Sequence, residues 1–304
     1  MKKSYPAKAM NSAAFSRVMP SRLFIRQREA DMGEKPLTLY GQALASRMLL
    51  GTARYDSPSV LVDAIAAADP AMLTVSVRRQ AGVAGRTFWN LLRESGRTIL
   101  PNTAGCLSAQ EAVKTACLAR ELFDTKRIKL EVIGDEVNLQ PDPFGLVDAA
   151  IELVRLGFQV FPYCTEDWVV CRRLLDAGCE VLMPWAAPIG TGQGPRNPRA
   201  LRELRDHLPT VPMIVDAGIG LPSHACQVME WGFDGVLLNT AVSRALDPVK
   251  MASAFADAIR SGRAGFKAGP MISQDIATSS TPEIGRPFTL DSTAPAEAPM
   301  LTSP

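Results

Sequence analysis

The chain has 304 residues, of which 47% are hydrophobic and 21% are charged, and its formal net charge is +2. This balance is typical of a globular protein and argues against a nucleic-acid or membrane-surface partner. The sequence contains no run of 18 or more apolar residues, so we expect no membrane-spanning helix.

The two ends of the chain differ in composition from the middle. Residues 1–36 are rich in Lys, Arg, Ser and Ala and lack the apolar segment of a secretory signal. An organellar transit peptide would fit, but we favour a disordered extension or a start site placed upstream of Met32. Residues 289–304 form a Pro/Ala/Ser/Thr tail that is predicted to be disordered. Residues 37–288 are predicted to form a single domain.

Eight short apolar runs bounded by Gly or Pro predict buried strands. The segments between several of them have helical spacing, and Ser108 with Glu111 predicts a capping box while Gly157 and Gly178 suit helix C-termini. Because strands and helices alternate, we expect a parallel sheet closed into a (β/α)8 TIM barrel, with a doubly wound open sheet as the alternative. The strand segments are "RMLLGTA", "MLTVSV", "TILPNT", "RIKLEVI", "QVFPYC", "EVLMPW", "VPMIVDAG" and "GVLLNT".

The strand "RIKLEVI" carries two charged residues on one face. Lys129 and Glu131 are two residues apart, so both point into the barrel if Ile128 and Leu130 face the helices. We expect desolvation to lower the pKa of Lys129, so that its amine can attack a carbonyl while Glu131 moves protons. A buried ion pair that only satisfies itself, or a strand with one face in solvent, is the structural alternative.

Three loops at predicted carboxyl ends of strands suit an anionic ligand. Asp216 ends the seventh strand, where barrel enzymes keep catalytic groups, and the turn of residues 217–220 after it exposes backbone N–H groups. Asn239 and Thr240 end the eighth strand, and the glycine-rich segment "PIGTGQG" of residues 188–194 follows the sixth. Plain turn chemistry is the alternative for the turn of residues 217–220, and a mobile lid without ligand contact suits residues 188–194 nearly as well.

The remaining motifs point away from metal and disulfide chemistry. The chain has two histidines, and none of its six cysteines forms a CxxC pair, so we expect reduced thiols, a cytoplasmic protein and no metal site. The residues alone therefore predict a barrel enzyme that forms a Schiff base with a phosphorylated carbonyl compound. A class I aldolase would fit this description equally well.

Seven motifs, taken in order, resemble the bacterial thiazole synthase family of thiamine biosynthesis. They are "SRMLLGTARY", "ILPNTAG", "IKLEVIGD", "QPDP", "PIGTGQG", "VDAGIG" and "VLLNTAVSRALDPVKMA", which span residues 37–288. The resemblance implies a (β/α)8 barrel that condenses 1-deoxy-D-xylulose 5-phosphate, dehydroglycine and sulfur. It implies no metal or organic cofactor.

The resemblance also assigns roles to residues and partners. By motif, Lys129 is the Schiff-base lysine, and Glu131 and Asp216 are the acid/base groups. Sulfur comes from a sulfur-carrier protein with a C-terminal thiocarboxylate, dehydroglycine comes from a glycine oxidase or a tyrosine lyase, and the family forms homo-oligomers, here expected to be a homotetramer. The positions that match the family's sugar-phosphate site are Gly190, Ala217, Gly218, Asn239 and Thr240.

One departure from the family pattern concerns the same site. Trp185 stands where a smaller residue is expected, just before the glycine loop, and is predicted to narrow the pocket. Two other hypotheses remain, an aldolase-type barrel without a protein partner and a catalytically silent scaffold. The second is disfavoured because Lys129, Glu131 and Asp216 are all present.

Overall fold

The computed structural model describes residues 35–77 and 83–278. The chain divides into two units, Met1–Gly269 and Pro270–Pro304, and the described residues 270–278 of the second contain neither helix nor strand. The predicted tail of residues 289–304 and nearly all of the predicted N-terminal extension lie outside the described residues. All helices and strands of the described residues lie in the first unit.

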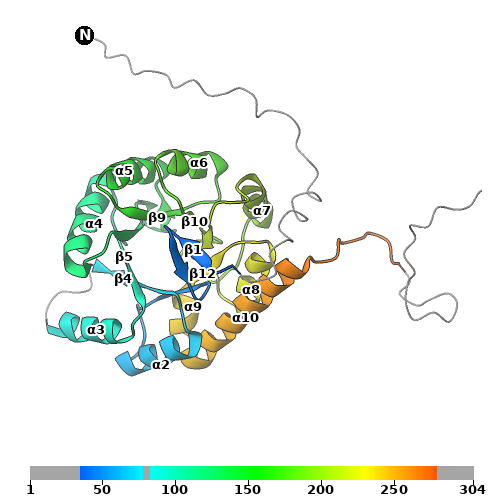
Figure 1. The fold of residues 1–304 in the computed structure, drawn as a ribbon, viewed down its shortest axis with the longest axis horizontal. Helices are drawn as coiled ribbons and strands as arrows, with labels where there is room; N and C mark the ends of the chain where they lie inside the picture. The colour runs from blue at the N-terminus through cyan, green and yellow to red at the C-terminus, as the bar shows by residue number, and fades with distance from the viewer. Residues whose placement is uncertain (1–34, 78–82, 279–304) are drawn as a thin grey trace, which may run out of the picture. The chain divides into compact units, whose positions relative to one another are not determined.

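Eight parallel strands form a ring, as the sequence predicted, so the open-sheet alternative is wrong (Figure 1). Neighbouring strands pair in the order β10-β9-β6-β5-β4-β3-β12-β11. Parallel bridges from Leu182 to Met213 and from Trp185 to Asp216 join the two end strands and close the ring. The strands are β3 (Met48–Gly51), β4 (Met72–Ser76), β5 (Thr98–Asn102), β6 (Arg127–Leu130), β9 (Gln159–Cys164), β10 (Met183–Pro184), β11 (Ile214–Val215) and β12 (Gly235–Leu238).

Helices surround the ring of strands (Figure 1). Ser108 begins one of them as predicted, because its hydroxyl accepts from the Glu111 N–H at 3.3 Å, and the Glu111 carboxylate accepts from the Leu107 N–H at 3.0 Å. Gly157 and Gly178 have φ of 81° and 100° just after two helices, as expected of C-terminal glycines. The helices are α2 (Pro58–Ala68), α3 (Val83–Glu94), α4 (Ala109–Phe123), α5 (Pro143–Arg155), α6 (Trp168–Asp176), α7 (Pro198–His207), α8 (Pro222–Glu230), α9 (Thr240–Ser243) and α10 (Pro248–Ala268).

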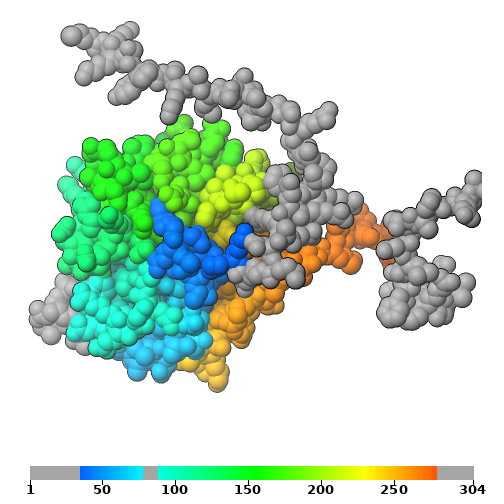
Figure 2. Space-filling model, viewed as in Figure 1, coloured from blue at the N-terminus to red at the C-terminus, as the bar shows by residue number. Residues whose placement is uncertain are grey.

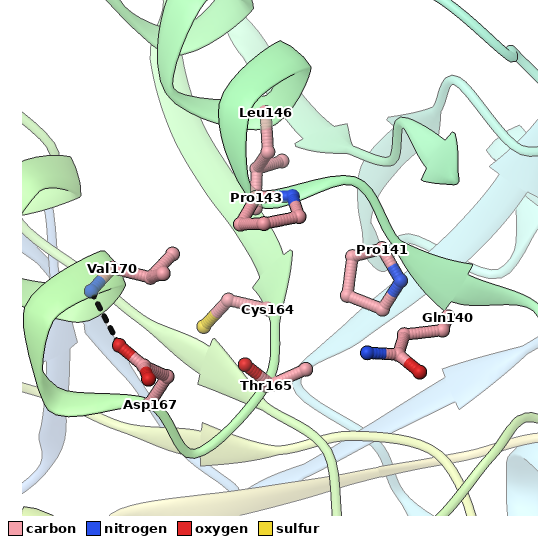
Figure 3. Close-up of a pocket in the computed structure, with 8 residues that line it drawn as sticks. All are labelled: Gln140, Pro141, Pro143, Leu146, Cys164, Thr165, Asp167 and Val170. Atoms are coloured by element: carbon pink, nitrogen blue, oxygen red, sulfur yellow. Dashed lines mark hydrogen bonds between the residues drawn. The ribbon is translucent and has the colours of Figure 1, made fainter. Parts of the chain in front are cut away.

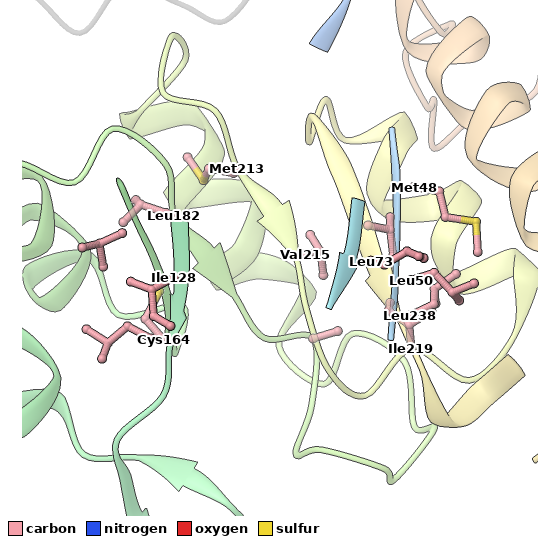
Figure 4. Close-up of a cluster of buried hydrophobic side chains, with 14 of the residues drawn as sticks. Met48, Leu50, Leu73, Ile128, Cys164, Leu182, Met213, Val215, Ile219 and Leu238 are labelled. Atoms are coloured by element: carbon pink, nitrogen blue, oxygen red, sulfur yellow. The ribbon is translucent and has the colours of Figure 1, made fainter. Parts of the chain in front are cut away.

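The outward strand side chains pack against these helices in the larger of two apolar clusters. Figure 4 shows part of it, where Met48 and Leu50 of β3 lie beside Leu73 of β4 and Leu238 of β12. Ile128 and Leu130 of β6 belong to the same cluster and are fully buried. The prediction that they face the helices is therefore confirmed.

A second apolar cluster fills the inside of the ring. Seven of the eight barrel strands contribute to it, and β6 places Lys129 inside instead. Because side chains alternate along a strand, the residue two positions further on points into the same space nearer the carboxyl ends. The inner apolar residues of the strands are Leu49, Met72, Leu100, Phe161, Met183, Ile214 and Leu237, and Val181 before β10 joins them.

A hairpin that the sequence analysis did not predict covers the amino-terminal ends of the strands. It consists of β1 (Leu37–Leu39) and β2 (Gln42–Leu44), joined by a turn in which Tyr40 and Gly41 have φ of 47° and 75°. The Tyr40 hydroxyl donates to the Val160 carbonyl at 2.6 Å. Figures 1 and 2 show the hairpin lying over the centre of the ring.

We expect the hairpin to act as part of the core. Leu39 is fully buried in the inner cluster, so Leu39→Ala should lower the free energy of unfolding by about 2–5 kcal/mol. Leu118→Ala on α4 is the control, because Leu118 is 53% exposed and its loss should cost little. Urea denaturation measures both, and equal effects would contradict a structural role for the hairpin.

Candidate active site

Lys129 and Glu131 lie inside the ring, as the spacing of two predicted. Lys129 is 5% exposed and Glu131, which follows β6, is 4% exposed. The Lys129 Nζ atom lies 2.9 Å from Oε1 of Glu131. The alternative of a solvent-facing strand face is therefore wrong.

Asp216, which is distant from Lys129 and Glu131 in the sequence, is the third charged residue of this cluster. It follows β11 and is 3% exposed, and its Oδ2 atom lies 2.6 Å from Nζ of Lys129. The ring closure at Trp185 and Asp216 brings the seventh strand to this position. One ammonium group thus contacts two carboxylates in a site with almost no exposed surface, which we call the Lys129 centre (Lys129, Glu131 and Asp216).

The expectation of a lowered lysine pKa is wrong for this arrangement. Burial by itself lowers the pKa of Lys129, but the nearby charges and hydrogen bonds of Asp216 and Glu131 raise it, and the net result lies above the usual value. The amine is therefore held as an ammonium ion until a proton leaves. The two carboxylate oxygens in contact with Nζ are the groups placed to take that proton.

Tyr163 is a neighbour of the Lys129 centre that sequence reasoning missed. Nζ of Lys129 lies 5.4 Å from the centroid of the Tyr163 ring, within the range of a cation–π contact. The side chain is fully buried, and burial raises the pKa of its hydroxyl group above the usual value. Its place two residues after the inner residue Phe161 was the available signal.

The glycine-rich segments after β10 and β11 contact each other. The Gly194 N–H donates to the Gly218 carbonyl at 2.8 Å. A Cβ atom on Gly220 would lie 2.2 Å from the Gly192 carbonyl oxygen, so the two backbones approach at a distance that only glycine permits. Gly190, Gly192, Gly194 and Gly218 also have positive φ, as the alternative of plain turn chemistry expects, and that alternative stays open.

The other predicted phosphate-site residues lie at the same end of the ring. Ala217 has φ of 60°, a left-handed conformation that costs a residue with a Cβ about 1 kcal/mol or more. A Cβ atom added to Gly190 would lie 4.0 Å from Oγ1 of Thr240, so these two predicted residues are neighbours. With the Asn239 amide turned so that both of its ends find partners, its nitrogen donates to the carbonyls of Ala53 at 2.9 Å and Gly51 at 3.3 Å. The Asn239 side chain in this orientation binds the backbone at the end of β3.

His224 joins the two glycine segments and was not predicted to do so. Its Nδ1 accepts from the N–H groups of Gly220 and Leu221, each at 3.3 Å. A Cβ on Gly194 would lie 2.8 Å from the imidazole ring, so this glycine packs directly on His224. The ring is therefore a structural part of the loop cluster.

Trp185 lies next to Asp216 in the strand register. Parallel neighbours in register place their side chains on the same face, so Trp185 belongs to the inner face at the mouth. It is half-buried, and its indole N–H donates to the carboxylate of Glu166 after β9. The predicted narrowing of the pocket stays a prediction.

Other candidate sites in the described residues do not touch the Lys129 centre. A cavity of about 190 Å³ lies between the starts of α5 and α6, and Figure 3 shows Cys164 on its wall. The six cysteines are free thiols, four of them buried, which agrees with the expectation of reduced core thiols. Within residues 35–77 and 83–278, no cluster of His, Cys, Asp or Glu suits a metal ion, and no helix could cross a membrane.

The fold and the Lys129 centre together define a class of protein. It is a closed (β/α)8 barrel with a buried lysine and two carboxylates at the carboxyl ends of its strands, where barrel enzymes carry their active sites. The chain belongs to the family of the thiazole biosynthesis protein ThiG, whose model matches residues 38–282. The predicted family is therefore confirmed.

Known relatives cover most of the chain. A thiazole synthase of Variovorax paradoxus is 64% identical, over 83% of this chain and 94% of the relative. One of Neisseria meningitidis is 62% identical, over 83% of this chain and 97% of the relative. A chain from the crystal structure of the Amycolatopsis orientalis BexX/CysO complex is 31% identical with a TM-score of 0.73, over 81% of this chain and all of that one.

We expect acid to weaken the glycine-loop cluster through His224. Burial lowers the pKa of His224, so the folded state favours the neutral ring that accepts both N–H groups. The unfolded chain takes up the proton first as the pH falls below about 6.5, so this contribution is full above that value and is lost as the pH falls through the lower pKa of the folded state.

The melting temperature of the wild type should therefore fall more steeply between about pH 7.5 and 5.5 than that of His224→Asn. His207→Asn removes the other histidine and should keep the wild-type slope. Parallel slopes for wild type and His224→Asn in thermal melts would show that the ring does not carry the effect.

Proposed function

We propose that the chain is a thiazole synthase that acts through a lysine Schiff base. It condenses 1-deoxy-D-xylulose 5-phosphate, dehydroglycine and sulfur from a thiocarboxylated carrier protein into the thiazole phosphate of thiamine. Membership of the ThiG family and the names of the relatives support the overall reaction. The observation that carries the mechanism is the buried ammonium group of Lys129 in contact with two carboxylates.

The first step is formation of the imine at Lys129. A proton passes from the ammonium group to Asp216 or Glu131, and the freed amine adds to the C2 carbonyl of the ketose. The C2 oxygen then leaves as water after protonation by a carboxyl group. The two carboxylates also stabilise the positive charge of the protonated imine in the dry interior.

The second step moves the carbonyl along the sugar. A carboxylate removes the proton from C3 of the protonated imine, which leaves an enaminol. A carboxyl group then returns a proton to C2 while a carboxylate takes the proton of the C3 hydroxyl group, so that the imine becomes an amine and C3 becomes a ketone. The thiocarboxylate of the carrier attacks C3, and dehydroglycine supplies the remaining atoms of the ring. Glu131 and Asp216 carry out the proton transfers at C2 and C3 of the sugar.

The substrate phosphate binds where the glycine loops meet. Backbone N–H groups of such loops are suited to phosphate oxygens, and the predicted residues there are Gly190, Ala217, Gly218, Asn239 and Thr240. The mutual contacts of the loops after β10 and β11 support this assignment. The strained backbone of Ala217 is a further sign of a functional loop.

The protein partners follow from the same proposal. A sulfur-carrier protein must bring its thiocarboxylate tail to the barrel mouth, and the solved relative was crystallised in a complex with CysO. A glycine oxidase or a tyrosine lyase supplies dehydroglycine. We propose that the enzyme is cytoplasmic and assembles as a homotetramer, without a metal or organic cofactor of its own.

We predict that 1-deoxy-D-xylulose 5-phosphate and borohydride give a covalent adduct on Lys129, found by mass spectrometry of the digest. Lys129→Ala and Lys129→Gln should give none, the second keeping a hydrogen-bond donor for the two buried carboxylates. Lys250→Ala is the control, because the Lys250 side chain lies on α10, outside the Lys129 centre, and is 88% exposed. An adduct on another lysine, or none in the wild type, would exclude the mechanism.

The full reaction separates the competing hypotheses. With thiocarboxylated carrier and dehydroglycine, the wild type should release a thiazole phosphate, which a class I aldolase would not make. An adduct with cleavage of the sugar and no thiazole would favour the aldolase. A folded protein without any adduct would favour the silent scaffold.

We predict that Glu131→Gln folds and still forms the adduct but turns over about a hundredfold more slowly, because general acid–base catalysis is worth at least that factor. Single-turnover and steady-state assays of thiazole phosphate measure this effect. Glu121→Gln on α4 is the control, since its side chain is 77% exposed. Turnover equal to that of the wild type would remove Glu131 from the proton transfers.

A further inference from the structure

Thr103 makes an unusual pair of hydrogen bonds to Glu131. Thr103 directly follows β5 and is fully buried. Its hydroxyl group donates to the Glu131 carbonyl at 2.8 Å and accepts from the Glu131 N–H at 2.8 Å. One hydroxyl group therefore satisfies both backbone polar groups of a residue in the Lys129 centre.

The regular pairing of β5 and β6 does not reach this far. Asn102 and Lys129 are partners in register, and β6 ends at Leu130. The Thr103 N–H still donates to the Lys129 carbonyl at 3.1 Å, but Glu131 lies beyond the strand. Because buried backbone groups need partners, the Thr103 side chain takes the place of the missing strand pairing.

The backbone position of Glu131 decides where its carboxylate lies. The side chain is short and buried, and its Oε1 contacts Nζ of Lys129 at 2.9 Å. A displacement of about 1 Å in such a contact can cost a hundredfold in rate. The Thr103 hydroxyl is thus linked through two short bonds to the geometry of the proton transfer.

We propose that Thr103 is a positioning residue for catalysis, a proposal that rests on the proposed function. Thr103 holds the Glu131 carboxylate at the distance from which it exchanges protons with the Lys129 amine and its imine. It acts through Glu131, with no role in binding the ketose or its phosphate. Its loss should therefore lower kcat and leave KM for the ketose phosphate nearly unchanged.

The test compares two substitutions of Thr103. Thr103→Val keeps the shape and removes both hydrogen bonds, and we expect kcat for thiazole phosphate to fall about 10- to 100-fold with KM within about threefold. Thr103→Ser keeps the hydroxyl group and should restore kcat to within about threefold. The borohydride adduct on Lys129 should form in both of them, because the imine forms before the steps that depend most on Glu131.

Thr125→Val, just before β6, is the matched control. The Thr125 hydroxyl accepts from the Arg127 N–H at 3.2 Å at the amino-terminal end of β6. This variant also loses a hydrogen bond to the backbone, but away from Glu131, and should keep the wild-type kcat.

Each remaining outcome decides the proposal. Wild-type kcat in folded Thr103→Val, a failure of Thr103→Ser to rescue, or a loss confined to KM would overturn it. If Thr103→Val does not fold, Thr103→Cys decides, because a thiol makes longer and weaker bonds: kcat below that of Thr103→Ser supports the proposal, and equal kcat overturns it. A wild type without adduct or thiazole product would instead refute the proposed function itself.

Discussion

The structure depends most on one electrostatic arrangement, the ammonium group of Lys129 between Asp216 and Glu131. Burying one positive and two negative groups is costly, and each charge is tolerated because its partners are within 2.9 Å. With both carboxylates ionised, the centre has a negative excess, which favours any cation that replaces the ammonium group. A protonated imine is such a cation, so the interaction that holds the lysine ammonium group would also suit the imine of the proposed reaction.

The barrel supplies this arrangement through simple alternation along its strands. The inner residues of one level are apolar, as Ile214 and Phe161 are, and two positions later come Asp216 and Tyr163. An apolar layer thus lies directly beneath the level of the Lys129 centre. This layer keeps water away from the charges and makes their mutual attraction stronger than it would be at the surface.

Local pattern was enough to predict much of this from the sequence. The apolar runs predicted all eight barrel strands, and the spacing of two residues placed Lys129 and Glu131 on one face. The direction of the lysine pKa could not be predicted in this way, because it depends on Asp216, which meets Lys129 only when the ring closes. The bonds of Thr103 to Glu131 and the packing of Gly194 on His224 are likewise contacts across separate elements, which no periodicity reports. The hairpin of β1 and β2 was missed because three-residue strands are too short to show a period.

The hairpin of β1 and β2 also limits how ligands reach the inside of the barrel. Leu37, Leu39 and Leu44 belong to the apolar filling of the ring, and Tyr40 fastens the hairpin to the start of β9. Because the hairpin closes the barrel at the amino-terminal ends of the strands, a molecule can reach Lys129 only from the carboxyl ends. In the proposed reaction, three reactants and the thiazole product would share this one opening. The sugar must then enter before the carrier's tail fills the opening, and the tail must leave before the thiazole is released.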